Sequence, residues 1–326
     1  MQVFTCGAAG CGQLLDGSQE DRSTPVLAPG LRVQRIEAGG TFTLAQVEEG
    51  LVCWSPAPVA LGVFPVTQIA CGWSHALLLG EGRVWTFGEG RHGQLGLGGV
   101  TKAPIPTVLR LPEQTKFVAC GFRTSFTVTA DEGQVYCFGD NKKDQLGLSS
   151  HSSYSVPTLH PSLRDVTMLA SGHRHTAAVI QCQVYMWGQN THGQFGQSLP
   201  SATSEPVTVA LPELQIAQVK CGWFHTGLLT HSGELYLAGK GDFGQQGAGQ
   251  FDDCSHFHLV LTQVEVLASG SEHLLALCSG QAFCWGWNEH GNLGLGDCLN
   301  RPSPHPVALP SLKTVAAAAA VSYFCA

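Results

Sequence analysis

Charged residues are scarce in this chain of 326 amino acids, of which Asp, Glu, Lys and Arg make up 13%. No run of five or more basic residues occurs, and the formal net charge at pH 7 is -7. The electrostatic footprint of a protein that binds nucleic-acid phosphates is therefore missing. We expect no direct nucleic-acid partner.

Long apolar stretches are also absent. No window approaches the roughly 18 apolar residues that a membrane-spanning helix requires, and residues 1–4 lack the charged and apolar regions of a secretion signal. We expect no membrane insertion. The chain is predicted to be a soluble monomer of the cytoplasm, with the nucleus as a second compartment.

The thirteen cysteines form no Cys-x-x-Cys pair and no regular disulfide-like spacing. We interpret them as reduced core thiols of a cytosolic or nuclear protein. By contrast, glycine is abundant, with 40 residues, and 44% of the chain is hydrophobic. This balance favours short buried strands joined by tight turns, so an all-β fold is expected.

An internal repeat appears first as a small-residue step into Gly, followed three residues later by His or a small polar residue. The spacings between successive motif glycines from Gly72 to Gly270 are 49, 51, 50 and 48 residues. The copies are Gly72 with His75, Gly121 with Thr124, Gly172 with His175, Gly222 with His225 and Gly270 with His273, with weaker copies at Gly40 with Thr43 and Ala319 with Ser322. Seven copies predict seven blades.

The second half of the repeat is a short apolar strand that ends in an aromatic-Gly step. It occurs at residues 84–88, 135–139, 184–188, 235–239 and 283–286, in degenerate form at 52–55, and at 3–7. The chain therefore begins with a second half-motif and ends with a first. We predict one domain over residues 1–326, a seven-bladed β-propeller in which Val3 to Cys6 complete the sheet begun by Val315 to Cys325 and close the ring.

In such a fold the motif glycines and histidines have structural roles. Each blade is covered by its neighbours, so the His three residues after the motif Gly is expected to pack in the core and to make a buried hydrogen bond. The same interpretation applies to the aromatic residue before the second Gly.

Three motifs suggest chemistry that the repeat does not support. Residues 88–93 and 239–244 match the G-x-G-x-x-G dinucleotide fingerprint, but they lead into another β-turn instead of a helix. Cys254, His256 and His258 lack the further ligands of a zinc site. Residues 72–75 lack the second Gly of a nucleophile elbow. We expect no cofactor, no metal and no catalytic site.

The two half-motifs and the turn Gly93-Gln94-Leu95-Gly96 together resemble the repeat of the regulator-of-chromosome-condensation family. The turn recurs at residues 144–147, 193–196 and 291–294, and less well at 244–247 and 12–15. Within the family, residues 269–273 and 284–291 are similar to the branch of the secretion-regulating guanine nucleotide exchange factor. They are also similar to its fungal relatives, which partner a small zinc protein in diphthamide synthesis and tRNA wobble-uridine modification.

Three departures from the family pattern shape the expectation. The blade around Trp54 lacks the Gly-Gln-Leu-Gly turn and must be short. Only about 25 residues separate each turn from the next motif Gly, such as Gly96 from Gly121. This leaves no room for the inserted β-wedge with which the Ran exchange factor acts on its GTPase. No basic tail precedes the first strand, which argues against chromatin docking.

The loop after the motif Gly and the loop after the aromatic-Gly step should emerge on the same face of the disc. This face is predicted to bind a partner protein, because Trp, Phe and Arg on loops are enriched in interface hot spots. The alternative is that its aromatic residues only plug the channel mouth. The face carries Trp73, Phe122, Arg123, His173, Arg174, Trp223, Phe224 and Glu272 near the channel, and Arg91, Lys142, Lys143, Lys240, Trp287 and Glu289 further out; Glu113 and Glu213 belong to the opposite face.

The sequence therefore predicts a binding protein and not an enzyme, acting as an adaptor or regulator of a small GTPase or of a secretion pathway. The candidate partners are a small GTPase, an exocyst component and the small zinc protein. A true exchange factor and a chromatin-associated propeller are the competing functions. The missing wedge counts against the first of these and the net acidity against the second.

Overall fold

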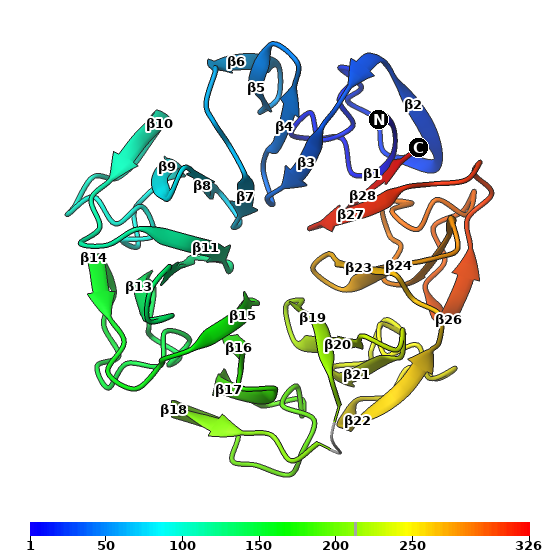
Figure 1. Ribbon diagram of the computed structural model, residues 1–326. Coiled ribbons are helices and arrows are strands. Elements are labelled where there is room, and N and C mark those ends of the chain that lie inside the picture. The colour runs from blue at the N-terminus through cyan, green and yellow to red at the C-terminus, as the bar shows by residue number, and fades with distance from the viewer. Residues whose placement is uncertain (212–213) are drawn as a thin grey trace.

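Seven four-stranded antiparallel sheets stand around a central channel in the computed structural model, which describes residues 1–211 and 214–326 (Figure 1). The described residues form 28 strands and no helix, and hence contain no helix that could cross a membrane. The predicted seven-bladed, all-β propeller is confirmed.

Six blades follow one another along the chain. Blade 1 comprises β3 (Arg35–Ala38), β4 (Thr43–Val47), β5 (Gly50–Trp54) and β6 (Pro58–Gly62); blade 2 comprises β7 (Gln68–Cys71), β8 (His75–Gly80), β9 (Arg83–Glu89) and β10 (Lys102–Leu109). Blade 3 comprises β11 (Thr115–Cys120), β12 (Thr124–Thr129), β13 (Val135–Gly139) and β14 (Tyr154–Leu159).

Blades 4 to 6 repeat this order. Blade 4 comprises β15 (Val166–Ser171), β16 (His175–Ile180), β17 (Gln183–Gln189) and β18 (Ala202–Thr208); blade 5 comprises β19 (Ile216–Cys221), β20 (His225–Thr230), β21 (Leu235–Gly239) and β22 (Cys254–Leu261). Blade 6 comprises β23 (Val266–Ser269), β24 (His273–Cys278), β25 (Gln281–Gly286) and β26 (Arg301–Pro306).

The seventh, composite blade joins both ends of the chain. Its strands run in the order β27 (Thr314–Ala318), β28 (Val321–Cys325), β1 (Gln2–Gly7) and β2 (Arg22–Arg32). β1 pairs with β28 from Val3 opposite Cys325 to Gly7 opposite Val321. The predicted closure is confirmed, and it leaves no unpaired sheet edge where the ring joins.

Position within a blade decides how each strand is buried. The second strands are buried along almost their whole length, as in β8, where every residue is buried, because both faces pack against neighbouring blades. The first strands (β3, β7, β11, β15, β19, β23 and β27) surround the channel (Figure 1). The buried hydrophobic residues form several clusters, and a cluster can contain residues of two adjacent blades, such as blades 3 and 4 or blades 5 and 6.

Blade 1 is the short blade, as the sequence predicted. Only residues 55–57 join β5 to β6, whereas 12 to 14 residues join the third and fourth strands of the other blades. The repeat there is also displaced by one residue from its predicted position. The Gly39 amide donates to the Phe42 carbonyl at 2.9 Å, the same bond that Gly72 makes to His75 at 2.8 Å. The motif pair is therefore Gly39 with Phe42, and not Gly40 with Thr43.

A similar displacement occurs in the composite blade. Val321 lies opposite Gly7 as His75 lies opposite Gly88, so Val321 and not Ser322 holds the histidine position. Sequence similarity misplaced both copies because Thr and Ser look like weak versions of the motif His. They occupy the next position along the strand, which is hydroxyl-bearing in several blades, as at Ser125 and Thr226.

This hydroxyl position supplies the partner of three of the four motif histidines, which are all fully buried, whereas His225 bonds to Ser269 at the end of a first strand. The Nε2 atom of His75 lies 2.9 Å from the Ser125 hydroxyl of the next blade, and that of His175 lies 3.0 Å from Thr226. His225 reaches Ser269 at 2.9 Å and His273 reaches Ser322 at 3.1 Å. The motif histidines thus connect neighbouring blades. Their glycines allow it, because a Cβ at Gly222 would collide with the His225 ring.

All thirteen cysteines are free, but they are not all core residues. Five of them are buried (Cys6, Cys53, Cys137, Cys284 and Cys325), and the others are partly or fully exposed. Cys71, Cys120 and Cys221 lie at the ends of first strands and line the channel.

Candidate protein-binding face

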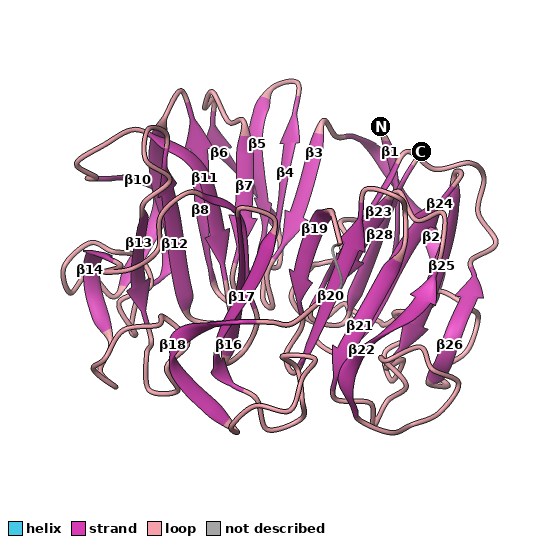
Figure 2. Ribbon diagram, turned by 60° about the horizontal axis from the view of Figure 1, so that its bottom comes forward, coloured by secondary structure: helices cyan, strands magenta, loops and turns pink. Residues whose placement is uncertain are grey.

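Loops gather on the two faces of the disc, at the ends of the strands (Figure 2). In each antiparallel blade the loops after the first and third strands share a face, here called the aromatic face. Backbone hydrogen bonds join these two loops within one blade: the amides of Glu89, Asp140 and Lys240 donate to the carbonyls of Ser74, Arg123 and Phe224 at 2.8–2.9 Å.

Four rings from different first-strand loops meet over the channel mouth. Trp73 of blade 2 lies 5.7 Å from Trp223 of blade 5, measured between ring centroids, and 5.1 Å from Phe122 of blade 3. His173 of blade 4 lies 4.4 Å from Phe122 and 5.4 Å from Trp223. These four residues, the aromatic plug, are all half-buried. They close the mouth and still expose part of each ring to solvent.

The backbone beneath the plug is fixed by hydrogen bonds between blades. The Gly40 amide donates to the Trp73 carbonyl at 2.7 Å, Trp73 to Phe122 at 3.2 Å, and Phe122 to Gly172 at 3.0 Å. On the other side of the mouth, Trp223 donates to Ser271 at 2.9 Å. Because these bonds use main-chain atoms, the plug side chains can be replaced without removing the framework that carries them.

A second group of rings continues from the plug towards blade 6. Phe224 lies 5.5 Å from His173, and Lys240 Nζ lies 5.9 Å from the Phe224 ring and 5.1 Å from the Phe243 ring. Phe243 then lies 6.2 Å from Trp287, which lies 5.2 Å from His290. Plug and extension together form the aromatic arc: Trp73, Phe122, His173, Trp223, Phe224, Phe243, Trp287 and His290.

Sequence reasoning missed Phe243 and His290, although a signal was present. Both stand two residues before the Gln or Asn of the repeated turn, the position that His92 and His192 hold in blades 2 and 4. The turn Gln holds this residue in place, since Gln245 Oε1 accepts from the Phe243 amide at 2.9 Å. Gly93 in this turn has φ +84°, and a Cβ there would collide with the Tyr154 carbonyl of the next blade.

Cations surround the arc over blades 2 to 4. The Arg123 guanidinium lies 4.9 Å from the Phe122 ring centroid, a cation-π distance, and Arg174 donates to Gln189 Oε1 at 3.3 Å. Arg91, Lys142 and Lys143 are exposed. Burial, and then the charges of Arg174 and Arg123, lower the pKa of His173 to about 4. The His173 ring is therefore neutral at pH 7 and acts as part of an aromatic surface.

Glu272 differs from the sequence-based expectation. Its side chain is buried, accepts from Gln245 Nε2 at 2.8 Å, and lies 3.9 Å from His225 Nδ1. It is thus a scaffold residue below the face. Glu289 is exposed, as is Glu113 on the opposite face, whereas Glu213 lies outside the described residues. Ring and cation-π contacts connect the predicted residues Trp73, Phe122, Arg123, Trp223 and Phe224, and reach Trp287 through Lys240 and Phe243. The hydrogen bond of Arg174 goes to Gln189 instead.

The motifs that resemble cofactor sites have structural explanations. Residues 88–93 and 239–244 run from a third strand into the repeated turn, and no helix follows within the described residues. Cys254, His256 and His258 lie along β22, where His258 Nε2 is 3.0 Å from the Gln246 carbonyl. No group of three or more potential metal ligands occurs in residues 1–211 and 214–326.

All 28 strands of the described residues belong to the seven blades, so these residues add no hairpin that would form a wedge. Fold and site thus define a seven-bladed propeller with one aromatic face. The chain belongs to the RCC1-like domain family, which matches residues 2–326.

Known relatives and solved structures extend this result. The Arabidopsis thaliana ultraviolet-B receptor UVR8 is 30% identical over 89% of this chain and 73% of its own. The Bos taurus secretion-regulating guanine nucleotide exchange factor is 28% identical over 95% of this chain and 79% of its own. Saccharomyces cerevisiae Prp20p, studied for its binding to Gsp1p and histones, superposes with a TM-score of 0.90 at 21% identity, covering 99% of this chain and 90% of that chain.

Proposed function

We propose that this chain is a protein-binding propeller whose aromatic face recruits or regulates a small GTPase. The aromatic arc carries the proposal. Half-exposed Trp and Phe rings, fixed on loops whose backbone is hydrogen-bonded between blades, lose little conformational freedom on binding. A relative named as a secretion-regulating exchange factor supports a GTPase as the partner class.

The charges around the arc specify the partner further. Arg91, Arg123, Lys142 and Lys143 lie over blades 2 and 3 and outnumber Glu89, Asp140 and Asp144 on the same side of these blades, while Asp21 and Glu289 lie over the composite blade and blade 6. A partner that covers the arc should therefore present acidic residues towards blades 2 and 3. Complementary charges of this kind mainly raise the association rate, which should fall with increasing salt.

The test is direct binding to purified small GTPases, Ran among them, each in GDP-bound, GTP-analogue-bound and nucleotide-free form. Biolayer interferometry with the immobilised chain should detect at least one of them, and Trp287→Ala should weaken that complex while Glu113→Ala leaves it unchanged. An exocyst subunit and the small zinc protein of diphthamide synthesis are measured in the same format. If the aromatic face binds the exocyst subunit or the small zinc protein and none of the GTPases, the GTPase assignment is wrong.

A further inference from the structure

The central channel is a cavity beneath the aromatic face, and Trp73, Phe122 and Trp223 of the aromatic plug line one end of it. The first strands of all seven blades enclose about 550 Å³, a volume within the range of small-molecule sites. The aromatic plug closes one mouth, because Trp73 and Trp223 contact each other from opposite sides of the ring. The channel is therefore a cup that a ligand enters from the opposite face, past Gln68, Gln218 and Thr314.

One level of this cup has an unusual composition. Each first strand has one residue that lies opposite the position two residues after the motif histidine of the second strand, as Ala70 lies opposite Leu77. The seven residues at this position form a ring around the channel. Five of the seven are alanine and the other two carry opposite charges. The ring comprises Glu37, Ala70, Ala119, Ala170, Lys220, Ala268 and Ala316.

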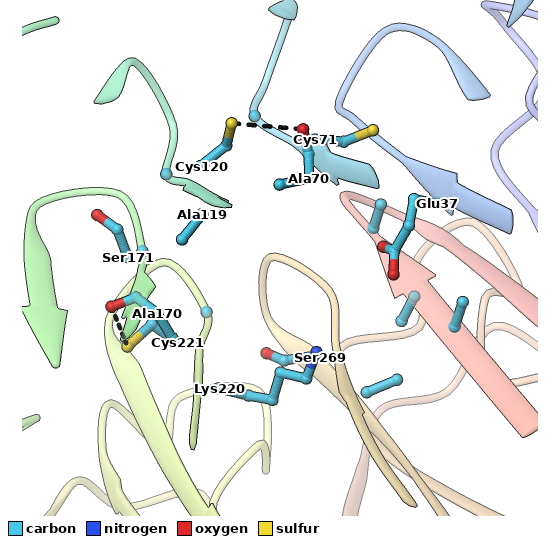
Figure 3. Close-up of a pocket in the computed structure, with 18 of the residues that line it drawn as sticks. Glu37, Ala70, Cys71, Ala119, Cys120, Ala170, Ser171, Lys220, Cys221 and Ser269 are labelled. Carbon is cyan, nitrogen blue, oxygen red and sulfur yellow. Dashed lines mark hydrogen bonds between the residues drawn. The ribbon is translucent and has the colours of Figure 1, made fainter. Parts of the chain in front are cut away.

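Glu37 and Lys220 come from blades 1 and 5, on different sides of the channel. Figure 3 shows both side chains reaching into the cup. They form no ion pair with each other, since no carboxylate oxygen of Glu37 lies within 4.0 Å of Lys220 Nζ. Burial raises the pKa of Glu37, and the Lys220 charge acts in the opposite direction. Both residues are half-buried, and neither forms an ion pair with a described residue.

We propose that the channel binds a small zwitterion, an ω-amino acid in chemical class, between Glu37 and Lys220. The ligand ammonium would pair with the Glu37 carboxylate, and the ligand carboxylate with the Lys220 ammonium. Both protein charges would then gain a charge-assisted hydrogen bond in a site of low dielectric. A ligand with one charge would neutralise only one of them and leave the other unpaired.

The rest of the wall fits the uncharged part of such a ligand. Ala70, Ala119 and Ala170 provide a smooth apolar surface for methylene groups. Burial raises the pKa of the Cys120 and Cys221 thiols to about 12, so both remain neutral at pH 7. The cup therefore contributes two charges and a mostly uncharged wall.

Isothermal titration calorimetry on the full chain with glycine, β-alanine, 4-aminobutyrate, 5-aminovalerate and 6-aminohexanoate tests the proposal. One chain length should bind best, since the charge separation in the cup is fixed. Butyrate and butylammonium, which carry one charge each, should bind at least tenfold more weakly than the best zwitterion. If no member of the series binds at 10 mM, or if butyrate binds as well as the best zwitterion, the proposal is wrong.

Variants locate the site. Glu37→Gln and Lys220→Met should each weaken binding at least tenfold, and the exchange Glu37→Lys with Lys220→Glu should restore it to within about threefold, with the ligand reversed. Circular dichroism and melting temperatures establish that each variant folds. Trp287→Ala, on the outer arc, should leave zwitterion binding unchanged. Unchanged affinity in folded Glu37→Gln or Lys220→Met would place the ligand elsewhere. Failure of these experiments would leave the proposed GTPase interaction untouched.

Discussion

The seams between blades and the aromatic face use the same residue types for different purposes. Trp187 and Trp285 are fully buried in seams, and their Nε1 atoms donate to the carbonyls of Gln145 and Gln245 at 3.1 Å. Trp73 and Trp223 are half-buried on the face and contact other rings. Trp187 and Trp285 precede a glycine in the sequence, whereas Trp73 and Trp223 follow one. The place in the repeat, and not the residue type, therefore decides whether a Trp is buried in a seam or half-exposed on the face.

Histidine shows the same contrast. His75 and His175 are fully buried and bond to hydroxyl groups of the next blade. His173, two residues before His175, points into the aromatic plug instead. Breaking a seam should therefore lower stability, and changing the face should lower affinity with little effect on stability.

The largest effect is expected at the seam that closes the ring. Deleting residues 1–8 removes β1, so that β28 loses its partner strand and β2 loses its place in the sheet. Two strand edges and the faces of adjoining blades become exposed, and the protein should aggregate or melt far earlier. Size-exclusion chromatography and differential scanning calorimetry measure both. A truncated chain that stays monomeric with an unchanged melting temperature would disprove the role of the composite blade.

Acid should weaken the other seams. Burial lowers the pKa of His75 to about 4 and the pKa of His175 and His273 to about 3. In the unfolded chain the histidine pKa is about 6.5. Below this pH the unfolded chain binds protons that the folded chain does not bind. Each histidine then removes about 1.4 kcal/mol of stability per pH unit, until the pH approaches its folded pKa. Urea unfolding should show a fall of several kcal/mol between pH 7.5 and pH 5.5.

The control is a histidine outside the seams. His231→Gln, at an exposed turn position, should leave this pH dependence unchanged. His175→Gln should reduce the loss of stability in acid by the contribution of one histidine. The raised pKa of Glu37 acts in the opposite direction, because its protonation in acid favours the folded state. A flat profile from pH 7.5 to pH 5.5 would mean that the seam histidines are protonated in the folded protein.

The seams could be predicted from the sequence better than the face could. Motif spacing located the blades and the closure at Val3 because strand order follows chain order. The displacement at Phe42 was missed because Thr43 imitates the motif. The contact between Trp73 and Trp223 joins residues 150 positions apart across the channel, which no local pattern encodes. The buried Glu272 accepts a hydrogen bond from Gln245 of the preceding blade. The pattern within the repeat that contains Glu272 does not encode this contact either.

Changes on the face should have a moderate effect that is confined to binding. Trp223→Ala and Trp287→Ala should weaken capture of the natural partner by at least about tenfold, or roughly 1.4 kcal/mol, because each removes an aromatic anchor. Folding should remain nearly intact, since the backbone bonds of these loops do not involve the side chains. Surface plasmon resonance and thermal melting measure the two properties separately.

The matched control is Glu113→Ala on the opposite face, where the side chain is exposed. It should change neither affinity nor melting temperature. If both tryptophans prove dispensable for binding and essential for stability, while Glu113 matters for binding, the rings only close the channel and the binding face lies on the other side.

The smallest effect is expected on nucleotide exchange. An exchange factor accelerates GDP release by binding the nucleotide-free GTPase more tightly than the loaded form, and this difference must come from groups that reach the nucleotide site. The described strands all belong to blades and supply no wedge, and the rings of the aromatic plug contact one another. Release of a fluorescent GDP analogue from Ran should therefore not rise appreciably when the chain is added, although EDTA, which removes Mg²⁺, releases it in the same assay. Trp287→Ala, which should reduce binding, should leave this rate equally unchanged. A large acceleration that Trp287→Ala abolishes would show that the face, without a wedge, is enough to displace the nucleotide.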